Sequence, residues 1–69
     1  HSFTVDEEFR FLNQTIAQAH LGEKHYSIVV AIERNDELIT LDKDTTFQLG
    51  DLVWIVGNRE KIREILYLT

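Results

Sequence analysis

The segment 46–58 constrains the fold of this chain most strongly, because a tight turn, an apolar strand and a helix start follow one another directly. Gly50 can adopt a positive φ without a Cβ clash, so the chain can reverse direction before Asp51. Leu52 to Val56 then offer no polar position. A strand that is apolar on both faces is typical of a central strand with both sides covered, and we expect that environment here.

The strand ends at Gly57, and the residues that follow predict a helix. Asn58 can accept hydrogen bonds from the free N–H groups of a helix that begins at Arg59. Apolar residues then recur at i, i+3 and i+4, namely Ile62, Ile65 and Leu66. We therefore expect this last helix to pack one narrow apolar stripe against the sheet.

Two more elements are predicted in the N-terminal part of the chain. Phe3 to Val5 reads as a short first strand. Thr15 and Gln18 have the spacing of a capping box, in which each side chain accepts a hydrogen bond from the other residue's backbone N–H. A helix is therefore expected from Ile16 to about Leu21, ended by Gly22.

Ser27 to Arg34 predicts another central strand, because it is apolar on both faces and rich in β-branched residues. It should lie beside the Leu52 to Val56 strand. Asn35 and Asp36 tolerate left-handed conformations, so they predict a tight hairpin that leads into a strand from Glu37 to Leu41. The predicted fold class is α+β, with the element order βαβββα.

The size of the chain predicts a partner. It has 69 residues and no cysteine, so neither a large core nor disulfides can stabilise it. We expect a single domain over residues 1–69 that also uses a partner subunit.

A formal net charge of -5 disfavours contact with nucleic acid, which needs clustered Lys and Arg. No apolar run is long enough to span a membrane, and the absence of Met suggests a fragment of a longer protein.

No arrangement of residues predicts catalysis or a bound cofactor. No nucleophile motif surrounds Ser2 or Ser27, and there is no Cys to pair with a His. His20 and His25 flank Glu23, but their separation is not a metal-ligand spacing. We predict two loop histidines, no metal site and no enzymatic activity.

Two groups of residues are candidates for binding. Arg34 and Asn35 lie where a strand meets the hairpin, and the Arg34 guanidinium can receive a phosphate or carboxylate. The alternative is an exposed arginine without a ligand. Trp54, the only tryptophan, is a candidate dimer anchor together with Ile28 and Val30, since Trp is enriched in binding hot spots. The alternative for Trp54 is core filling.

The motifs, taken in order, resemble the RCK_C domain, also called the TrkA C-terminal domain. They are the Thr-led helix at 15–19, the strand Ile28 to Arg34, its hairpin, and Leu49-Gly50-Asp51 followed by an apolar strand and Gly57. The resemblance covers residues 3–66 and implies a βαβββα domain that commonly pairs with another copy on the cytoplasmic side of the cell membrane. Such domains are attached to potassium channels, potassium uptake systems, cation/proton antiporters and some anion or dicarboxylate transporters, where a small ligand or ion regulates the membrane pore.

Members that look like cyclic di-AMP binders carry an arginine after the first helix, an asparagine entering the next strand and a proline beyond the hairpin. This sequence has Gly22 and Ile28 at the first two places and the proline-free segment 41–44 at the third. Without the cationic fork and the amide, the phosphate and base contacts are lost, so cyclic di-AMP is not expected to bind.

We therefore predict a cytoplasmic regulatory domain, for ligand sensing or dimerisation, of a monovalent-cation (potassium) channel, uptake system or cation/proton antiporter. It would act as a homodimer joined to a membrane-embedded portion of the same or a partner chain. The alternative is a ligand-free structural assembly module of an anion or dicarboxylate transporter. An enzyme or a nucleic-acid-binding domain is a third possibility, disfavoured by the missing catalytic residues and the acidic charge.

Overall fold

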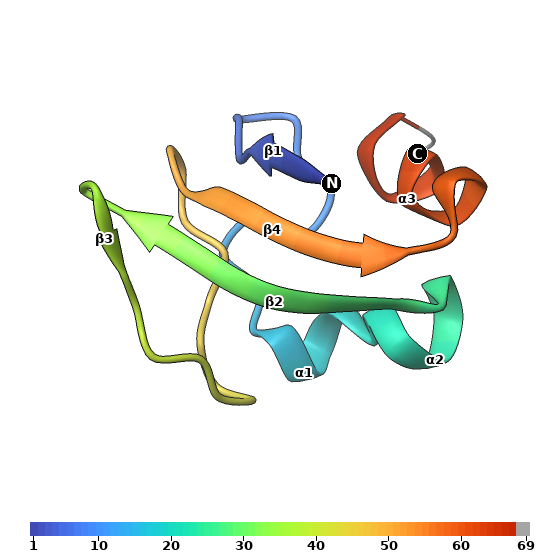
Figure 1. The fold of residues 1–69 in the computed structure, drawn as a ribbon, viewed down its shortest axis with the longest axis horizontal. Helices are drawn as coiled ribbons and strands as arrows, with labels where there is room; N and C mark the ends of the chain where they lie inside the picture. The colour runs from blue at the N-terminus through green and yellow to red at the C-terminus, as the bar shows by residue number, and fades with distance from the viewer. Residues whose placement is uncertain (68–69) are drawn as a thin grey trace.

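The chain forms a four-stranded antiparallel sheet in the order β1-β4-β2-β3, with short helices packed beside it (Figure 1). The structure, a computed structural model, describes residues 1–67. Its elements are β1 (Ser2–Thr4), α1 (Ile16–Ala19), α2 (Leu21–His25), β2 (Ser27–Arg34), β3 (Glu37–Leu38), β4 (Leu52–Gly57) and α3 (Arg59–Tyr67). The fold is α+β as predicted, and the predicted order holds except that two short helices replace the first one.

β2 and β4 form the centre of the sheet, as predicted. Ser27 pairs with Gly57 at one end and Glu33 with Leu52 at the other. The first pairing requires glycine at position 57, because a Cβ there would lie 2.5 Å from Ser27 Oγ and 2.8 Å from the carbonyl oxygen of Tyr26. The two long strands can therefore approach closely where β4 ends.

β1 pairs with β4 one residue earlier than predicted, at Ser2–Thr4 in place of Phe3 to Val5. Val5 instead bonds to the turn before β4, with its N–H donating to Asp51 O at 2.8 Å and its carbonyl accepting from Gly50 N at 2.9 Å. Gly50 has a φ of +89°, which confirms the predicted positive φ. The first strand and the Gly-Asp turn thus hold each other in place.

The β2–β3 hairpin turns at Asn35 and Asp36 with φ values of 55° and 65°, as predicted. The predicted strand from Glu37 to Leu41 is too long, because β3 ends at Leu38. Ile39 N still donates to Ile32 O at 3.0 Å. A side-chain-bonded turn then begins at residue 42 and directs the chain away from the sheet edge, with Asp42 N donating to Thr45 Oγ1 at 3.0 Å.

The capping box is confirmed, with Gln18 N donating to Thr15 Oγ1 at 3.0 Å and Thr15 N to Gln18 Oε1 at 2.8 Å. The prediction that this helix runs to Leu21 and ends at Gly22 is wrong. His20 adopts a left-handed conformation with φ 51°, so α1 ends there and Gly22 lies inside α2. The break redirects the chain, and Leu21 becomes buried at 5% exposure.

α3 begins after Asn58, whose Oδ1 accepts from Glu60 N at 2.8 Å, so the predicted cap is confirmed. Ile62 and Ile65 are buried and Leu66 packs against the core, as the apolar stripe predicts. None of the helices in the described part of the chain has the length and apolarity needed to cross a membrane.

The core lies between one face of the sheet and the helices. Aromatic rings fill its centre, with Phe9 and Phe47 at 5.4 Å between centroids. The expectation that β2 and β4 are covered on both faces is wrong. Within β4, Val53 and Ile55 are buried whereas Trp54 and Val56 are exposed, because this short chain supplies helices for one face only. The buried apolar residues are Val5, Phe9, Phe11, Ala19, Leu21, Ile32, Phe47, Val53, Ile55, Ile62 and Ile65.

Candidate functional site

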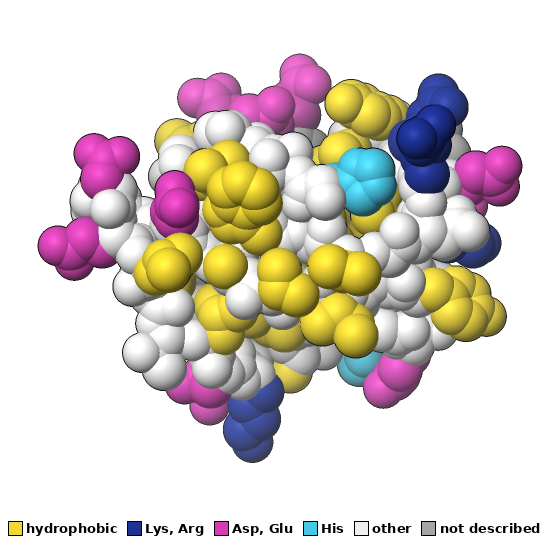
Figure 2. All heavy atoms as spheres, viewed as in Figure 1, with side chains coloured by type: hydrophobic (Ala, Val, Ile, Leu, Met, Phe, Trp, Pro, Cys, Tyr) yellow, Lys and Arg dark blue, Asp and Glu magenta, His cyan; other side chains and the backbone are white. Residues whose placement is uncertain are grey.

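The face of the sheet that the helices leave uncovered, called the open face below, carries exposed apolar side chains on β2 and β4. Ile28 is 66% exposed, Val30 54%, Trp54 40% and Val56 60%. Figure 2 shows hydrophobic side chains gathered over these two strands. An exposed apolar surface of this kind on a small domain is typical of an interaction site.

The strand register makes the open face continuous. Ile28 lies opposite Val56, and Ala31 lies opposite Trp54 in the next row. Residues directly opposite one another on one face of a sheet have Cβ atoms about 5 Å apart, so these side chains adjoin. The structure therefore brings Ile28 and Trp54, both predicted interface residues, onto one surface. Their role in pairing stays a prediction, but the core-filling alternative for Trp54 is wrong.

A β-bulge places Val30, the third predicted interface residue, on this surface. Val29 pairs with Ile55 and the next ladder pair is Ala31 with Trp54, so Val30 is an extra residue without a partner on β4. The bulge breaks the regular alternation of β2, so Val30 and Ala31 both lie on the open face.

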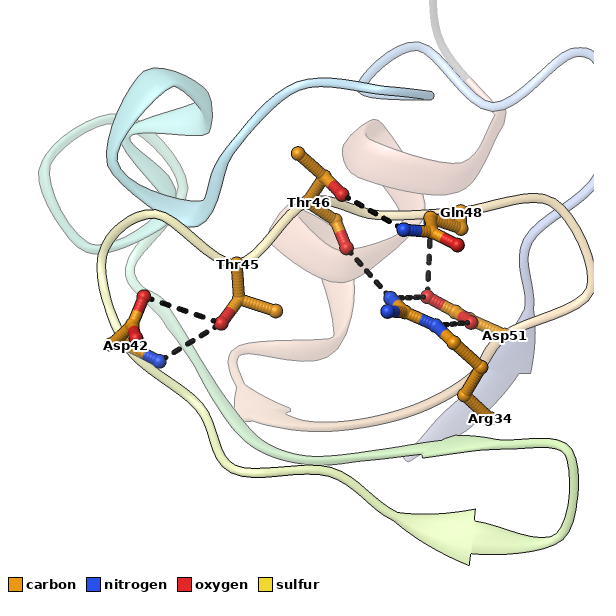
Figure 3. A network of polar contacts seen from close by, with 6 residues as sticks. All are labelled: Arg34, Asp42, Thr45, Thr46, Gln48 and Asp51. Carbon is orange, nitrogen blue, oxygen red and sulfur yellow. Dashed lines mark hydrogen bonds and ion pairs between the residues drawn. The ribbon is translucent and has the colours of Figure 1, made fainter.

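Arg34 and Asp51 form a paired network at the opposite end of β2 from the α2 junction (Figure 3). Arg34 Nε donates to Asp51 Oδ1 at 2.8 Å, and Nη2 donates to Asp51 Oδ2 at 2.8 Å and to Thr46 O at 3.0 Å. Gln48 N donates to Asp51 Oδ2 at 2.9 Å. The network fastens the turn before β4 to the end of β2, across 17 residues of sequence.

Both partners of this network are held in their charged forms. Burial by itself raises the pKa of Asp51, but hydrogen bonds from Arg34 and Gln48 and the Arg34 charge together outweigh it, so the pKa lies below its usual value. The hydrogen bond to Asp51 raises the pKa of Arg34. This pairing was not predicted, although the opposite charges at the ends of two apolar strands were a usable signal in the sequence.

The exposed, ligand-free arginine offered as the alternative for Arg34 is not what the structure shows, since the Arg34 side chain is 26% exposed and bound to Asp51. Asn35 lies in the hairpin turn, where its φ of 55° gives a structural reason for asparagine. Nε and Nη2 of Arg34 are already used within the chain. The assignment of Arg34 and Asn35 as ligand-binding residues stays a prediction.

Gly22 and Ile28, the positions compared with cyclic di-AMP binders, line one surface hollow of about 320 Å³ between α2 and the start of β2. Its other lining residues include His20 and Glu23, and among the described residues neither Lys nor Arg contributes to it. A phosphate group there would meet the Glu23 carboxylate without a cation to offset it. The expectation that cyclic di-AMP does not bind therefore stays a prediction with a structural argument.

The two histidines considered as metal ligands have different environments. His20 lies at the turn between α1 and α2, with Nδ1 3.6 Å from Glu23 Oε2. The prediction of a loop position is wrong for His25, which ends α2 and is only 8% exposed. Within residues 1–67 no group of three or more potential metal-ligating side chains is found.

Comparison with known proteins identifies the family and the fold. The TrkA-C domain model matches residues 1–68, and no curated protein sequence matches the chain. The RCK_C domain dimer of S. agalactiae BusR in complex with c-di-AMP is 19% identical with a TM-score of 0.83, covering 99% of this chain and 91% of that one. An RCK domain with cda is 24% identical with a TM-score of 0.79, covering 99% and 93%.

A longer structure has the same fold as one of its parts. S. agalactiae BusR in complex with its busAB-promotor DNA is 19% identical with a TM-score of 0.80, covering 99% of this chain and 35% of that one. These similarities establish the fold, and the family match extends over nearly the whole sequence. The chain therefore belongs to the TrkA-C domain family and has the RCK_C fold.

Proposed function

We propose that this chain is a regulatory domain that pairs with a second copy of itself through the open face. The pair would regulate a potassium or other monovalent-cation channel, uptake system or cation/proton antiporter from the cytoplasmic side of the membrane. The observation that carries the proposal is the uncovered apolar surface of Ile28, Val30, Trp54 and Val56. Membership of the TrkA-C domain family supports the regulatory role.

The energy available from the open face suits a reversible dimer. Full burial of one large apolar side chain contributes about 1.5–3 kcal/mol. Because the side chains of the open face are roughly half exposed, each copy contributes about 3–6 kcal/mol and the pair about 6–12 kcal/mol. The loss of translational and rotational freedom on association costs about 4–15 kcal/mol. These opposing terms are similar in size, so we expect a dimer that can rearrange.

A rearranging pair is what a regulatory mechanism requires. A ligand shifts an equilibrium between two arrangements only by binding one of them more tightly. Ile28 belongs both to the open face and to the hollow beside α2, so a ligand in the hollow would lie close to the partner copy. The BusR domain forms a dimer with c-di-AMP, but the hollow of this chain has no Lys or Arg among its described lining residues, which argues against that ligand here.

Analytical ultracentrifugation of matched variants tests the pairing. Ile28→Glu places a charge at the open face and should convert a dimer to a monomer with unchanged circular dichroism. Leu49→Glu is the control, because Leu49 is 59% exposed but lies in the turn before β4. An unaltered chain that is monomeric at high micromolar concentration would contradict the proposal, as would a Leu49→Glu variant that dissociates as readily as Ile28→Glu.

A second candidate is a ligand-free assembly module of an anion or dicarboxylate transporter. It is favoured by the lack of Lys and Arg among the described residues that line the hollow, since an anionic ligand would find no cation there. A melting-temperature screen over nucleotides, divalent cations and potassium separates the two. A ligand present at about 100 times its dissociation constant adds roughly 2.7 kcal/mol to the stability of the folded state. If the dimer forms but no compound raises the melting temperature, the assembly role is favoured.

Neither candidate assigns a catalytic role or a nucleic-acid contact to this chain. The net charge of -5 supports the proposal that the chain does not contact nucleic acid. BusR was solved with promoter DNA, but this chain covers only 35% of the BusR chain. A fluorescence-anisotropy titration with a labelled duplex at low salt should show no binding, and salt-dependent binding would contradict the expectation.

A further inference from the structure

The imidazole of His25 is a buried polar group that neither the core nor the open face explains. His25 is 8% exposed, and its Nδ1 is buried without a hydrogen-bond partner in the described part of the chain. The ring of Phe11 stands edge-on to it, with 5.9 Å between centroids and 68° between planes. Buried polar atoms normally have partners, so an unpartnered nitrogen calls for an explanation.

The charged groups that act on His25 are mostly cationic and come from the segment before α1, from α2 and from α3, whereas β2 contributes none of them. Arg10 approaches from the segment before α1, Lys24 from α2 itself, and Lys61 from α3. Glu64 on α3 is the acidic group of this set, and its Oε1 lies 3.5 Å from Lys61 Nζ. Within residues 1–67, the acidic group that acts on His25 is therefore shared with a lysine.

Protonation of His25 is unfavourable for a clear physical reason. When the neutral ring carries its proton on Nε2, Nδ1 is an acceptor without a donor. A second proton would bind to Nδ1 and create a buried N–H group without an acceptor. Burial first, and then the charge of Arg10, lower the pKa of His25 below its ordinary value of 6.5, with smaller contributions from Lys61 and Lys24. Glu64 alone opposes them by raising it.

We propose that His25 is a proton-binding site that loosens α2 from α3 and from the start of β2 when the pH falls. The connections are direct: α2 contacts both elements, and the His25 carbonyl accepts a hydrogen bond from Ser27 Oγ at 2.8 Å at the first residue of β2. Ile28, on the open face, follows immediately. The proton is thus a ligand of the domain itself, and the site does not depend on the pairing proposed above.

The direction of the pH effect follows from linkage. A histidine whose pKa is lower in the folded state takes up its proton more readily in the unfolded state. The stability associated with neutral His25 is therefore complete above about pH 7.5, is lost as the pH falls through 6.5, and stops changing below the folded-state pKa. Each unit between the folded and unfolded pKa changes the folding equilibrium constant about tenfold.

Two measurements on the 69-residue chain test the proposal. An NMR titration of the histidine ring protons should show His25 titrating below 6.5. Amide exchange at Tyr26, whose N–H donates to Leu21 O at the end of α2, should accelerate at acid pH beyond the change in intrinsic exchange rate. A His25 ring that titrates at or above 6.5, or a Tyr26 amide with unchanged protection, overturns the proposal.

Matched variants assign the effect to His25. Chemical unfolding of the unaltered chain from about pH 8 to about pH 5, at one protein concentration, gives the pH-dependent loss. His25→Phe keeps an aromatic ring, and its stability should fall less between about pH 8 and about pH 5 than that of the unaltered chain. The stability of His20→Gln should fall as much as that of the unaltered chain. An equal loss in His25→Phe overturns the proposal. If that variant does not fold, the ring titration and Tyr26 exchange of the unaltered chain decide the matter.

Discussion

Replacing Arg34 with Met removes the cation that pairs with Asp51 while keeping a side chain of similar length. Asp51 is 1% exposed, so its carboxylate cannot exchange the lost partner for bulk water. The hydrogen bond from Gln48 N at 2.9 Å is the contact left to it in the described network. We expect a large loss of stability from a buried charge that has lost its counter-charge.

The magnitude follows from the burial of the pair. Removing one partner of a buried ion pair costs about 3–5 kcal/mol. The Arg34 side chain is 26% exposed and the Gln48 bond remains, so we expect the lower end, about 3 kcal/mol. A domain of this size is stable by roughly 3–10 kcal/mol, so Arg34→Met should retain about 0–7 kcal/mol and unfold at a lower urea concentration than the unaltered chain.

Urea unfolding followed by Trp54 fluorescence measures this loss, because Trp54 lies in the central strand β4. Arg63→Met is the control: Arg63 is an exposed arginine of α3, and its replacement should change the stability by less than about 0.5 kcal/mol. The double variant Arg34→Met/Asp51→Asn should be more stable than Arg34→Met, because it no longer buries a lone charge. An Arg34→Met variant as stable as the Arg63→Met control, or a less stable double variant, would refute the reasoning.

Three further predictions concern stability. Gly57→Ala should destabilise the fold by about 1–3 kcal/mol, because its Cβ would lie 2.5 Å from Ser27 Oγ; unchanged urea unfolding would refute this. Thr15→Ala removes the acceptor for Gln18 N and should cost about 1 kcal/mol in the same assay, and a neutral result would show that the capping box adds nothing. The lowered pKa of Asp51 makes its contribution complete above about pH 5 and lost as the pH falls through 3.8 toward the folded-state pKa. Asp51→Asn should therefore show a flatter acid-unfolding profile, and a profile as steep as that of the unaltered chain would count against it.

Elements defined by local chemistry could be predicted from the sequence. The hairpin depends on two residues that tolerate positive φ, and the caps at Thr15 and Asn58 depend on side-chain oxygens at a fixed spacing. The first helix could not be predicted correctly. The helix breaks at His20, which adopts a left-handed conformation although histidine does not usually predict one. Glycine does predict such a conformation, but Gly22 lies inside α2. α2 packs against β2, and a contact between segments of this kind is not a local property of the sequence.

The candidate site could be predicted only in part, for a similar reason. Apolar residues on β2 and β4 identified Ile28, Val30 and Trp54, but the sequence of a strand does not say which of its faces the chain will cover. The pairing of Arg34 with Asp51 joins two strands that are distant in sequence, so it appears only once the sheet is assembled. His25 lies in a polar, glycine-containing stretch, and nothing local marks it as buried.

The bulge at Val30 has a consequence for sequence change in this domain. Without Val30, the remaining residues of β2 would alternate regularly, with Val29 and Ile32 still facing the core and Ala31 still opposite Trp54. A single-codon deletion at this position would thus keep every other side chain on its own side of the sheet. The same deletion at Ile32 would turn the downstream residues over and expose the Arg34 anchor to solvent. A change in the length of β2 is therefore tolerable at position 30 and costly at position 32, two residues before the strand ends.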